Sequence, residues 1–303
     1  ACDVLRHAAD PDMALNNWER FAGVLPEVQT HYRLWLSQPR RIEILLTVLA
    51  GSQYLSDTLV RHPDFLDWAT DPAVIGAPRR RAELTADLAG MTGVCGEHAD
   101  WLNRLRLFKR RETLRIGTRD MCLHVPVEEV TADLSMLADA IVEDALAREW
   151  MRVKAAGDGE DAVHAEMKAR FCVLALGKLG GRELNYSSDI DLLAFYDDKA
   201  AAGAELEDDF PQRTLARLVD WLRGDLSRHT ETGYVYRVDL RLRPHGRAGR
   251  LVPSLSALIA YYSKNAALWE IQALLKARPV AGSLVAGERF MTAAGSLLAA
   301  GHS

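Results

Sequence analysis

Residues 171–196 read FCVLALGKLGGRELNYSSDIDLLAFY and hold the most informative pattern in the sequence. An apolar run from Phe171 to Leu176 stops at a glycine, which is typical of a short buried strand. A glycine-bearing loop follows, and a second apolar segment extends from Asp189 to Tyr196. We therefore predict two strands joined by this loop.

Two carboxylates stand at the start of the second predicted strand. Side chains at positions i and i+2 of a strand point to the same side, so Asp189 and Asp191 should project together while Ile190 points away. Like charges in a buried place repel each other strongly unless a cation lies between them. The pair therefore predicts a site for a divalent cation.

A third strand is predicted from Tyr234 to Arg243. One face of this strand is apolar or aromatic, with Tyr234, Tyr236, Val238, Leu240 and Leu242. The other face carries one acid among three cations: Arg237, Asp239, Arg241 and Arg243. Because each desolvated charge needs a partner, a strand that serves the fold alone would rarely carry so many charges on one face. A phosphate held by Arg241 or Arg243 would suit the forked guanidinium group.

The loop between the first two strands is a candidate phosphate cradle. Gly177, Gly180 and Gly181 permit positive φ and let backbone N–H groups approach an anion closely. The hydroxyl groups of Ser187 and Ser188 would add hydrogen bonds. The loop is neither a Walker A motif nor a dinucleotide-binding G-x-G-x-x-G. For Lys178, a substrate contact and a solvated loop side chain stay open as alternatives.

The rest of the chain indicates an α+β protein with two domains. Apolar residues at helical spacing predict helices at Leu15–Phe21, Tyr32–Leu49, Trp101–Ile116 and Val130–Val153. A small, polar stretch at 155–161 marks the boundary between a helical domain, 1–155, and a small α/β domain, 156–303. In the second domain we predict a helix with Pro211 in its first turn and an apolar stripe from Leu215 to Leu226. Two helices, Ser254–Asn265 and Leu268–Lys276, are predicted to close the chain.

Composition narrows the function classes. The chain has 303 residues and a net charge of −5, which gives no basic excess for a partner such as DNA or RNA. It contains no apolar stretch of ~20 residues and no secretory signal, so we expect a cytoplasmic protein without a membrane partner. The four cysteines form no C-x-x-C and no cluster with histidine, so we expect reduced thiols and no structural zinc site.

Three charged runs are interpreted as solvent-exposed. The basic runs Arg104–Arg111 and Arg79–Arg81 are most simply solvated faces, and the acidic run Glu205–Asp209 is most simply an exposed linker.

Residues 177–192, GKLGGRELNYSSDIDL, closely resemble the signature of the glutamine synthetase adenylyltransferases, which belong to the DNA polymerase β-like nucleotidyltransferase superfamily. The resemblance continues in residues 236–244, YRVDLRLRP, and in Trp269-Glu270 with Ala273, Lys276, Ala277 and Arg278. It reaches the helical half in Leu15–Phe21, Gly51–Ser56 and Arg110–Gly117.

Members of this family carry two homologous halves. The amino-terminal half removes AMP from adenylylated glutamine synthetase by phosphorolysis, giving ADP, and the carboxy-terminal half adds AMP from ATP. The signature occurs once here, after a helical region, and Glu183–Asn185 and Arg237–Asp239 are more similar to the removing half. The resemblance implies Asp189 and Asp191 as Mg²⁺ ligands with Asp239 as the third acid. It also implies glutamine synthetase, adenine nucleotide and phosphate as partners, with the PII signalling protein for a full-length enzyme.

Two departures from the family pattern are present. The second half is missing, so we expect a fragment, an excised domain or a shortened homologue. Arg250 stands where the family pattern has proline, after the third predicted strand.

Three alternatives stay open. The same triad would serve adenylylation of glutamine synthetase from ATP. The chain would alternatively be a non-catalytic module that binds glutamine synthetase or PII. A general nucleotidyltransferase acting on small molecules or RNA is the weakest alternative, because the acidic balance disfavours RNA.

Overall fold

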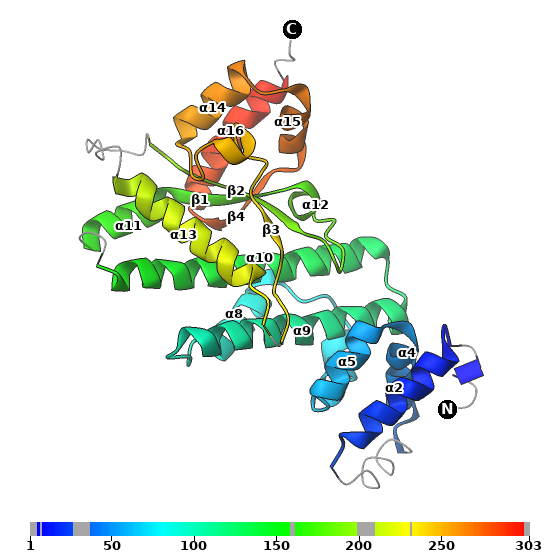
Figure 1. Ribbon diagram of the computed structural model, residues 1–303. Helices are drawn as coiled ribbons and strands as arrows, with labels where there is room; N and C mark the ends of the chain where they lie inside the picture. Colours follow the sequence, from blue (N-terminus) through cyan, green and yellow to red (C-terminus); the bar gives the residue numbers. More distant parts are fainter. Residues whose placement is uncertain are drawn as a thin grey trace. The chain divides into compact units, whose positions relative to one another are not determined.

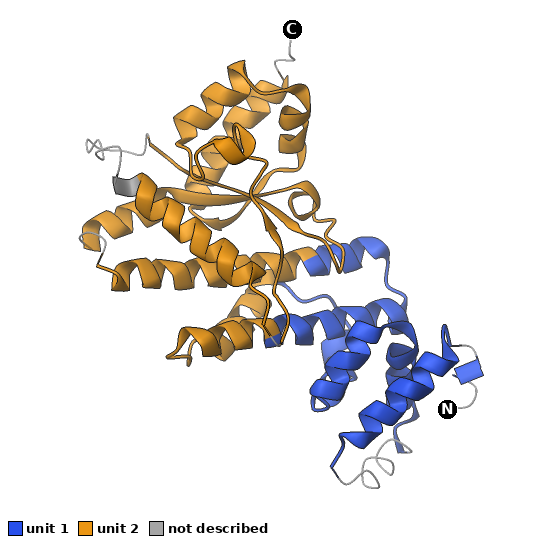
Figure 2. Ribbon diagram, viewed as in Figure 1, with its two compact units in different colours: residues 1–80, 107–134 blue, residues 81–106, 135–303 orange. Residues whose placement is uncertain are grey.

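The chain folds into two compact units (Figure 2). The computed structural model describes residues 5–6, 8–26, 37–157, 161–198, 210–230 and 232–299. The first unit contains residues 1–80 and 107–134, and the second contains residues 81–106 and 135–303. Part of the predicted helix at Tyr32, part of the predicted boundary at 155–161 and the whole run Glu205–Asp209 lie outside the described residues. The domain boundary after residue 155 stays a prediction.

The first unit is helical. Its elements are α2 (Pro11–Gly23), α4 (Pro39–Gly51), α5 (Gln53–Arg61), α6 (Phe65–Ala69), α7 (Pro72–Ile75), residues 107–123 of α9 (His98–Leu123) and residues 127–134 of α10 (Val127–Ala155). Side-chain caps fix several starts: the Asp10 carboxylate accepts the Met13 N–H, and the Ser52 hydroxyl accepts the Leu55 N–H.

Aliphatic and aromatic side chains of these helices form the core of the first unit, including Phe21, Leu49 and Leu59. A second, charged cluster is buried in the same unit. Arg115 is fully buried and donates to Glu112 at 2.8 Å and to Asp133 at 3.4 Å. Because these ions are withdrawn from water, removing one partner would leave an uncompensated buried charge.

A mixed four-stranded sheet forms the centre of the second unit, with strand order β3-β2-β1-β4. The strands are β1 (Phe171–Leu176), β2 (Ile190–Tyr196), β3 (Val238–Asp239) and β4 (Arg278–Gly282). β1 lies antiparallel to β2 and to β4, and β2 lies parallel to β3. All six residues of β1 are buried, as expected of a strand that is covered on both faces.

Helices cover both faces of this sheet (Figure 1). α14 (Leu255–Lys264), α15 (Leu268–Ala273) and α16 (Leu284–Ala299) lie on one side, whereas α13 (Phe210–Ser227) and residues 135–155 of α10 lie on the other. The unit also contains α8 (Arg81–Thr92), residues 98–106 of α9, α11 (Asp161–Arg170), α12 (Gly177–Gly180) and 3-10 turns at Gly246–Ala248 and Leu274–Lys276.

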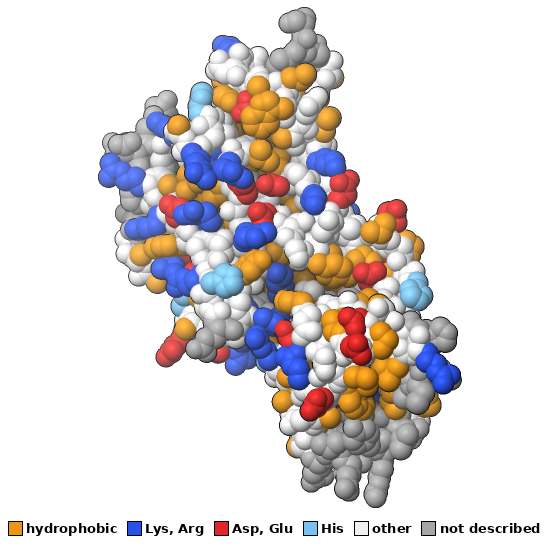
Figure 3. All heavy atoms as spheres, turned by 45° about the vertical axis from the view of Figure 1, so that its right-hand side comes forward, with side chains coloured by type: hydrophobic (Ala, Val, Ile, Leu, Met, Phe, Trp, Pro, Cys, Tyr) orange, Lys and Arg blue, Asp and Glu red, His pale blue; other side chains and the backbone are white. Residues whose placement is uncertain are grey.

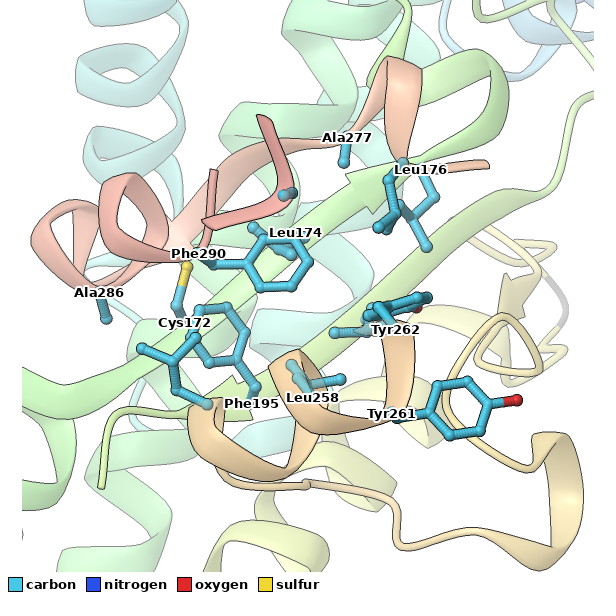
Figure 4. Packing of buried hydrophobic residues seen from close by; sticks show 14 of the residues in the cluster. Cys172, Leu174, Leu176, Phe195, Leu258, Tyr261, Tyr262, Ala277, Ala286 and Phe290 are labelled. Carbon is cyan, nitrogen blue, oxygen red and sulfur yellow. The ribbon is translucent and has the colours of Figure 1, made fainter. Parts of the chain in front are cut away.

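The main apolar cluster lies between the sheet and α14–α16 (Figure 4). Cys172 and Leu174 of β1 and Phe195 of β2 meet Tyr262 of α14 and Phe290 of α16. On the opposite face, the ring of Phe171 contacts Trp150 of α10 edge-on at 5.8 Å. A buried pair adds a polar tie to the same helix, because Arg278 of β4 donates twice to Asp139 of α10, at 2.7 and 2.9 Å.

Several predictions of the sequence analysis are confirmed. The α+β class, the helices within α2, α9 and α10, and the strand β1 are as expected. The stripe on α13 is buried throughout: Leu215, Leu218, Val219, Leu222 and Leu226. The second strand begins at Ile190, so that Asp189 precedes it by one residue.

The predicted third strand, Tyr234–Arg243, is wrong in length, because only Val238 and Asp239 pair with β2. The preceding backbone bonds to the end of α13 instead: the N–H groups of Val235 and Tyr236 both donate to the Leu226 carbonyl. After Asp239 the chain turns, since the Asp239 carboxylate accepts the N–H of Arg241. Hydrogen bonds to a helix end and to a side chain thus replace the expected ladder.

The carboxy-terminal prediction is incomplete. α14 is confirmed, and α15 with the following 3-10 turn fills the second predicted helix. Those helices do not close the chain, however, because β4 and α16 come after them. β4 is short and contains Pro279, and it pairs with β1 across a register shift between Val173 and Leu174, so its own sequence carries little strand signal.

The basic runs are not solvated faces. Arg106 is 1% exposed and donates to the carbonyl groups of Gly233 and Arg228, and burial lowers the pKa of Lys109 to about 8. Arg79 pairs with the buried Glu112 at 2.6 Å. Long basic side chains with apolar stems can be buried in this way when carbonyl or carboxylate oxygens receive their charged ends.

Among the described residues, the helices fall short of the length and apolar character that crossing a lipid bilayer requires.

A glycine contact provides a test of the packing around α12. A Cβ atom on Gly180 would lie 2.2 Å from the Lys276 carbonyl oxygen and 2.8 Å from that of Ala175. We expect Gly180→Ala to lower the free energy of unfolding by about 1–3 kcal/mol, because backbone has to move. The control is Gly224→Ala in α13, where a Cβ meets nothing within 4 Å, and which should raise stability by about 0.5–1 kcal/mol. Urea denaturation followed by circular dichroism measures both, and equal effects would contradict the packing argument.

Candidate functional site

The three predicted acids lie at the same end of the neighbouring strands β2 and β3. Asp191 pairs with Leu176 at the end of β1 on one side and with Asp239 of β3 on the other. Asp189 precedes β2 by one residue, and Ile190 between the two acids is buried. Asp189 and Asp191 therefore flank a buried residue, and strand pairing places Asp239 beside Asp191. The carboxylate oxygens of the three acids do not all lie within 4.8 Å of one another, and the shared cation site stays a prediction.

The three carboxylates repel one another electrostatically. Burial raises the pKa of Asp191, and the neighbouring negative charges of Asp239 and Asp189 raise it further. A half-buried carboxylate beside two others is costly to ionise, which is the condition that a bound cation relieves. Of the three acids, Asp191 is therefore the one whose ionised form is least favoured.

Two arginines partly neutralise the outer acids. Arg237 donates through Nε to Asp189 Oδ1 at 2.5 Å and through Nη2 to the Ser187 carbonyl at 3.5 Å. Arg241 donates to Asp239 Oδ2 through Nε at 2.8 Å and Nη2 at 2.5 Å, and this hydrogen bonding lowers the pKa of the Asp239 carboxyl group. Both guanidinium groups are exposed, so each can move away from its partner at little cost.

Gly177 leaves room for Asp191. Its φ is +54°, and a Cβ atom built there would lie 2.4 Å from Asp191 Oδ2. Any other residue would push this carboxylate out of place. The three side chains offer carboxylate oxygens only, which are the hard ligands that Mg²⁺ prefers, so the residues present fit the cation that the resemblance implies.

The remaining loop residues take mixed positions. Gly177–Gly180 forms the helical turn α12, and the N–H groups of Gly181 and Glu183 already donate within the loop. Gly180 and Gly181 pack against Lys276, and Lys178 is exposed. The Ser188 hydroxyl accepts the Asn185 N–H, whereas Ser187 is exposed. Gly177 reaches the acids directly, and the phosphate cradle stays a prediction.

An open pocket of about 520 Å³ lies beside the acids. Its charged lining consists of Asp189, Asp239, Asp220, Arg223, Arg241, Arg243 and Arg247. Figure 3 shows Lys and Arg side chains gathered beside Asp and Glu side chains on one face of the sheet-containing unit. Arg241 is paired with Asp239 and Arg223 with Asp220, so the lining carries both charges, and the exposed arginines in it suit an oxyanion.

Both arginines that the sequence analysis named for phosphate, Arg241 and Arg243, line this pocket. Arg243 lines it but donates to the carbonyl groups of Leu240, Gly249 and Arg247, so its guanidinium group mainly supports the turn. Arg223 on α13 and Arg247 after the turn were missed. The spacing of these two residues from Asp239 carries no local signal, because the fold of the turn and the helix brings them together.

The family model for glutamate-ammonia ligase adenylyltransferase matches residues 42–293. The chain belongs to this family. The match includes the signature loop, all three acids and the pocket-lining arginines.

Curated relatives agree. Proteins from Thioalkalivibrio sulfidiphilus, Streptomyces coelicolor and Cutibacterium acnes are each 36% identical to this chain, over 83%, 96% and 95% of its length. Each is named a bifunctional glutamine synthetase adenylyltransferase/adenylyl-removing enzyme. The chain spans about a quarter of their length, 26–28%.

The contact at Gly177 predicts a binding defect. We expect Gly177→Ala to weaken binding of Mg²⁺, or of Mn²⁺ as its paramagnetic substitute, by at least about tenfold, because the new methyl group displaces Asp191. Gly181→Ala is the control, since a Cβ there meets the flexible Lys276 side chain at 2.9 Å instead. Electron paramagnetic resonance of free Mn²⁺ measures the affinity. Equal affinity in the two variants would show that Asp191 does not bind the ion.

Proposed function

We propose that this chain removes AMP from adenylylated glutamine synthetase by phosphorolysis, releasing ADP and the unmodified enzyme. The observation that carries the proposal is the convergence of Asp189, Asp191 and Asp239 beside an arginine-lined pocket, in a member of this family. In the reaction, an oxygen of inorganic phosphate bonds to the phosphorus of the AMP–tyrosine diester. The bond from phosphorus to the tyrosine oxygen breaks, and the phenolate takes up a proton.

The three acids would hold Mg²⁺. Bound there, the cation would neutralise charge on the phosphoryl oxygens and on the leaving phenolate. Asp191 is the central ligand, because it lies between β1 and Asp239 and carries the raised pKa. Arg237 and Arg241 balance the outer carboxylates in the absence of substrate.

The arginine pocket would receive the attacking phosphate. Arg241 lines the pocket and also contacts Asp239, so it links the anion site to the acids. Arg247 is exposed, lines the same pocket and lowers the pKa of Asp239 through its charge. We assign Arg241, Arg247 and Arg223 to phosphate, with Arg243 supporting the turn. Holding the nucleophile in line with the diester would supply much of the rate gain.

The direction of the reaction rests on the resemblance of Glu183–Asn185 and Arg237–Asp239 to the removing half. Adenylylation from ATP would use the same acids, and a non-catalytic module would bind glutamine synthetase or PII without turnover. Purified chain is therefore offered adenylylated glutamine synthetase with phosphate and Mg²⁺, or unmodified glutamine synthetase with ATP and Mg²⁺. Release of ADP in the first mixture supports the proposal. Modification in the second mixture alone, or no reaction in either, overturns it.

Loss of the central acid should abolish this activity. We expect Asp191→Asn to lower kcat by at least about 10³-fold, because it removes a ligand and a charge while keeping the side chain's shape. Asp189→Asn should act in the same direction. Circular dichroism should show an unchanged fold for both variants, and full activity in either would contradict the metal assignment.

Arg247 should act through phosphate. We expect Arg247→Gln to raise the KM for phosphate by about tenfold with a smaller change in kcat, because a charged hydrogen bond to the anion contributes about 1.5–3 kcal/mol. Arg250→Gln is the matched control: Arg250 is exposed in the same loop but does not line the pocket. Initial rates at varied phosphate concentration distinguish the two, and equal KM values would remove Arg247 from the phosphate site.

A further inference from the structure

A second cluster of potential metal ligands lies within the sheet-containing unit, on residues other than those of the candidate site. His98 at the start of α9, Glu149 of α10 and Asp225 of α13 each offer one ligand atom, and these atoms all lie within 4.8 Å of one another. Among the residues that the structure describes, the ligand atoms of this group are close enough to share an ion as they stand, whereas those of the three acids of the candidate site are farther apart.

Glu149 is the residue that points to a ligand. Its side chain is completely buried, and neither of its carboxylate oxygens has a hydrogen-bond partner. Asp225 is 2% exposed and its Oδ2 atom is also without one. Burial, and then the neighbouring Asp225, raise the pKa of Glu149. Two adjacent buried carboxyl groups with open lone pairs are rare, because each unmet oxygen is costly.

Nearby cations compensate only in part. Nη1 of Arg152 lies 3.5 Å from Glu149 Oε2 and 4.0 Å from Asp225 Oδ2, beyond hydrogen-bond distance in the second case. The Arg152 guanidinium group stacks on Trp221 with its carbon 3.9 Å from the ring centre, and the side chain is 42% exposed. Arg106 also attracts Asp225 but donates its hydrogen bonds to backbone carbonyl groups.

The geometry suits a shared cation. Nε2 of His98 lies 2.9 Å from Asp225 Oδ2, and the two groups form an ion pair when the imidazole is protonated. Ligand atoms bound at ~2.0–2.1 Å to a tetrahedral zinc ion stand about 3.3 Å apart, so a small side-chain adjustment would admit the ion. His98 and Arg152 line an open pocket of about 430 Å³, which provides access from solvent.

We propose that His98, Glu149 and Asp225 form a binding site for a divalent transition-metal ion of the Zn²⁺ type. One imidazole and two carboxylates suit Zn²⁺ better than Mg²⁺, which favours oxygen ligands and retains water. The three ligands come from three helices far apart in the sequence, and the sequence analysis therefore expected no zinc site.

This site has a structural role. It joins α13 to α9 and α10 close to the carboxy-terminal end of α13. At that end the Leu226 carbonyl accepts the N–H groups of Val235 and Tyr236, and the Ser227 hydroxyl accepts the N–H of Val238. The bound ion would hold the helix end to which the backbone at the start of β3 is hydrogen-bonded.

Zinc binding to the metal-stripped chain tests the proposal. The protein carries Asp189→Asn and Asp191→Asn, so that the candidate active site does not contribute. We expect one Zn²⁺ per chain to survive desalting, measured by atomic emission, and a higher thermal midpoint with Zn²⁺. His98→Ala and Glu149→Gln should each weaken Zn²⁺ binding at least about tenfold in isothermal titration calorimetry. His98 is partly exposed, so its variant should fold even if the Glu149 variant does not.

Controls separate this site from other zinc-binding groups. Glu143→Gln changes a half-exposed acid on the same helix α10, and His229→Ala removes a histidine outside the cluster; neither should alter affinity. The Co²⁺ derivative should show visible ligand-field bands without the charge-transfer band of a cysteine thiolate. Absence of stoichiometric Zn²⁺, unchanged affinity in the His98 and Glu149 variants, or a thiolate band would overturn the proposal. None of these readouts depends on AMP removal.

Discussion

The antiparallel pairing of β1 with β2 is the constraint on which the candidate site depends. Pairing runs from Phe171 with Tyr196 to Leu176 with Asp191, and every residue of β1 is buried. Because side chains alternate along a strand, a slip of one residue would exchange the directions of Asp191 and Leu192 and turn the carboxylate away from Asp239. The hydrophobic free energy of burying β1 on both faces therefore fixes the direction of a carboxylate.

The charges around that carboxylate show how a polar site is kept in a stable protein. The acid with the greatest burial has acidic neighbours, whereas the two more exposed acids have arginine partners at their sides. Arginines that face solvent can exchange partners at low cost, so under the proposed function the same groups would serve the resting site and an incoming anion. Because Gly177 has no side chain, the Asp191 carboxylate fits beside it.

Local periodicity explains which features could be predicted. Patterns that repeat every two or every 3.6 residues predicted β1, the start of β2, the stripe on α13 and the Asp189–Asp191 pair. The long signature predicted the family. The start of the predicted third strand was wrong, because Val235 and Tyr236 bond to Leu226 rather than to a neighbouring strand. The sequence around Arg106, Arg223 and His98 does not distinguish them from solvent-exposed residues. Their positions depend on contacts with segments far away in the chain.

The brevity of β3 has a mechanical consequence. Asp239 is joined to the sheet through two paired residues, and the backbone just before it is anchored to the last turn of α13. The spacing between this acid and Asp191 therefore follows the position of a helix end. If the proposed reaction uses all three acids, a displacement of α13 would separate two of the carboxylates while β1 and β2 stayed paired.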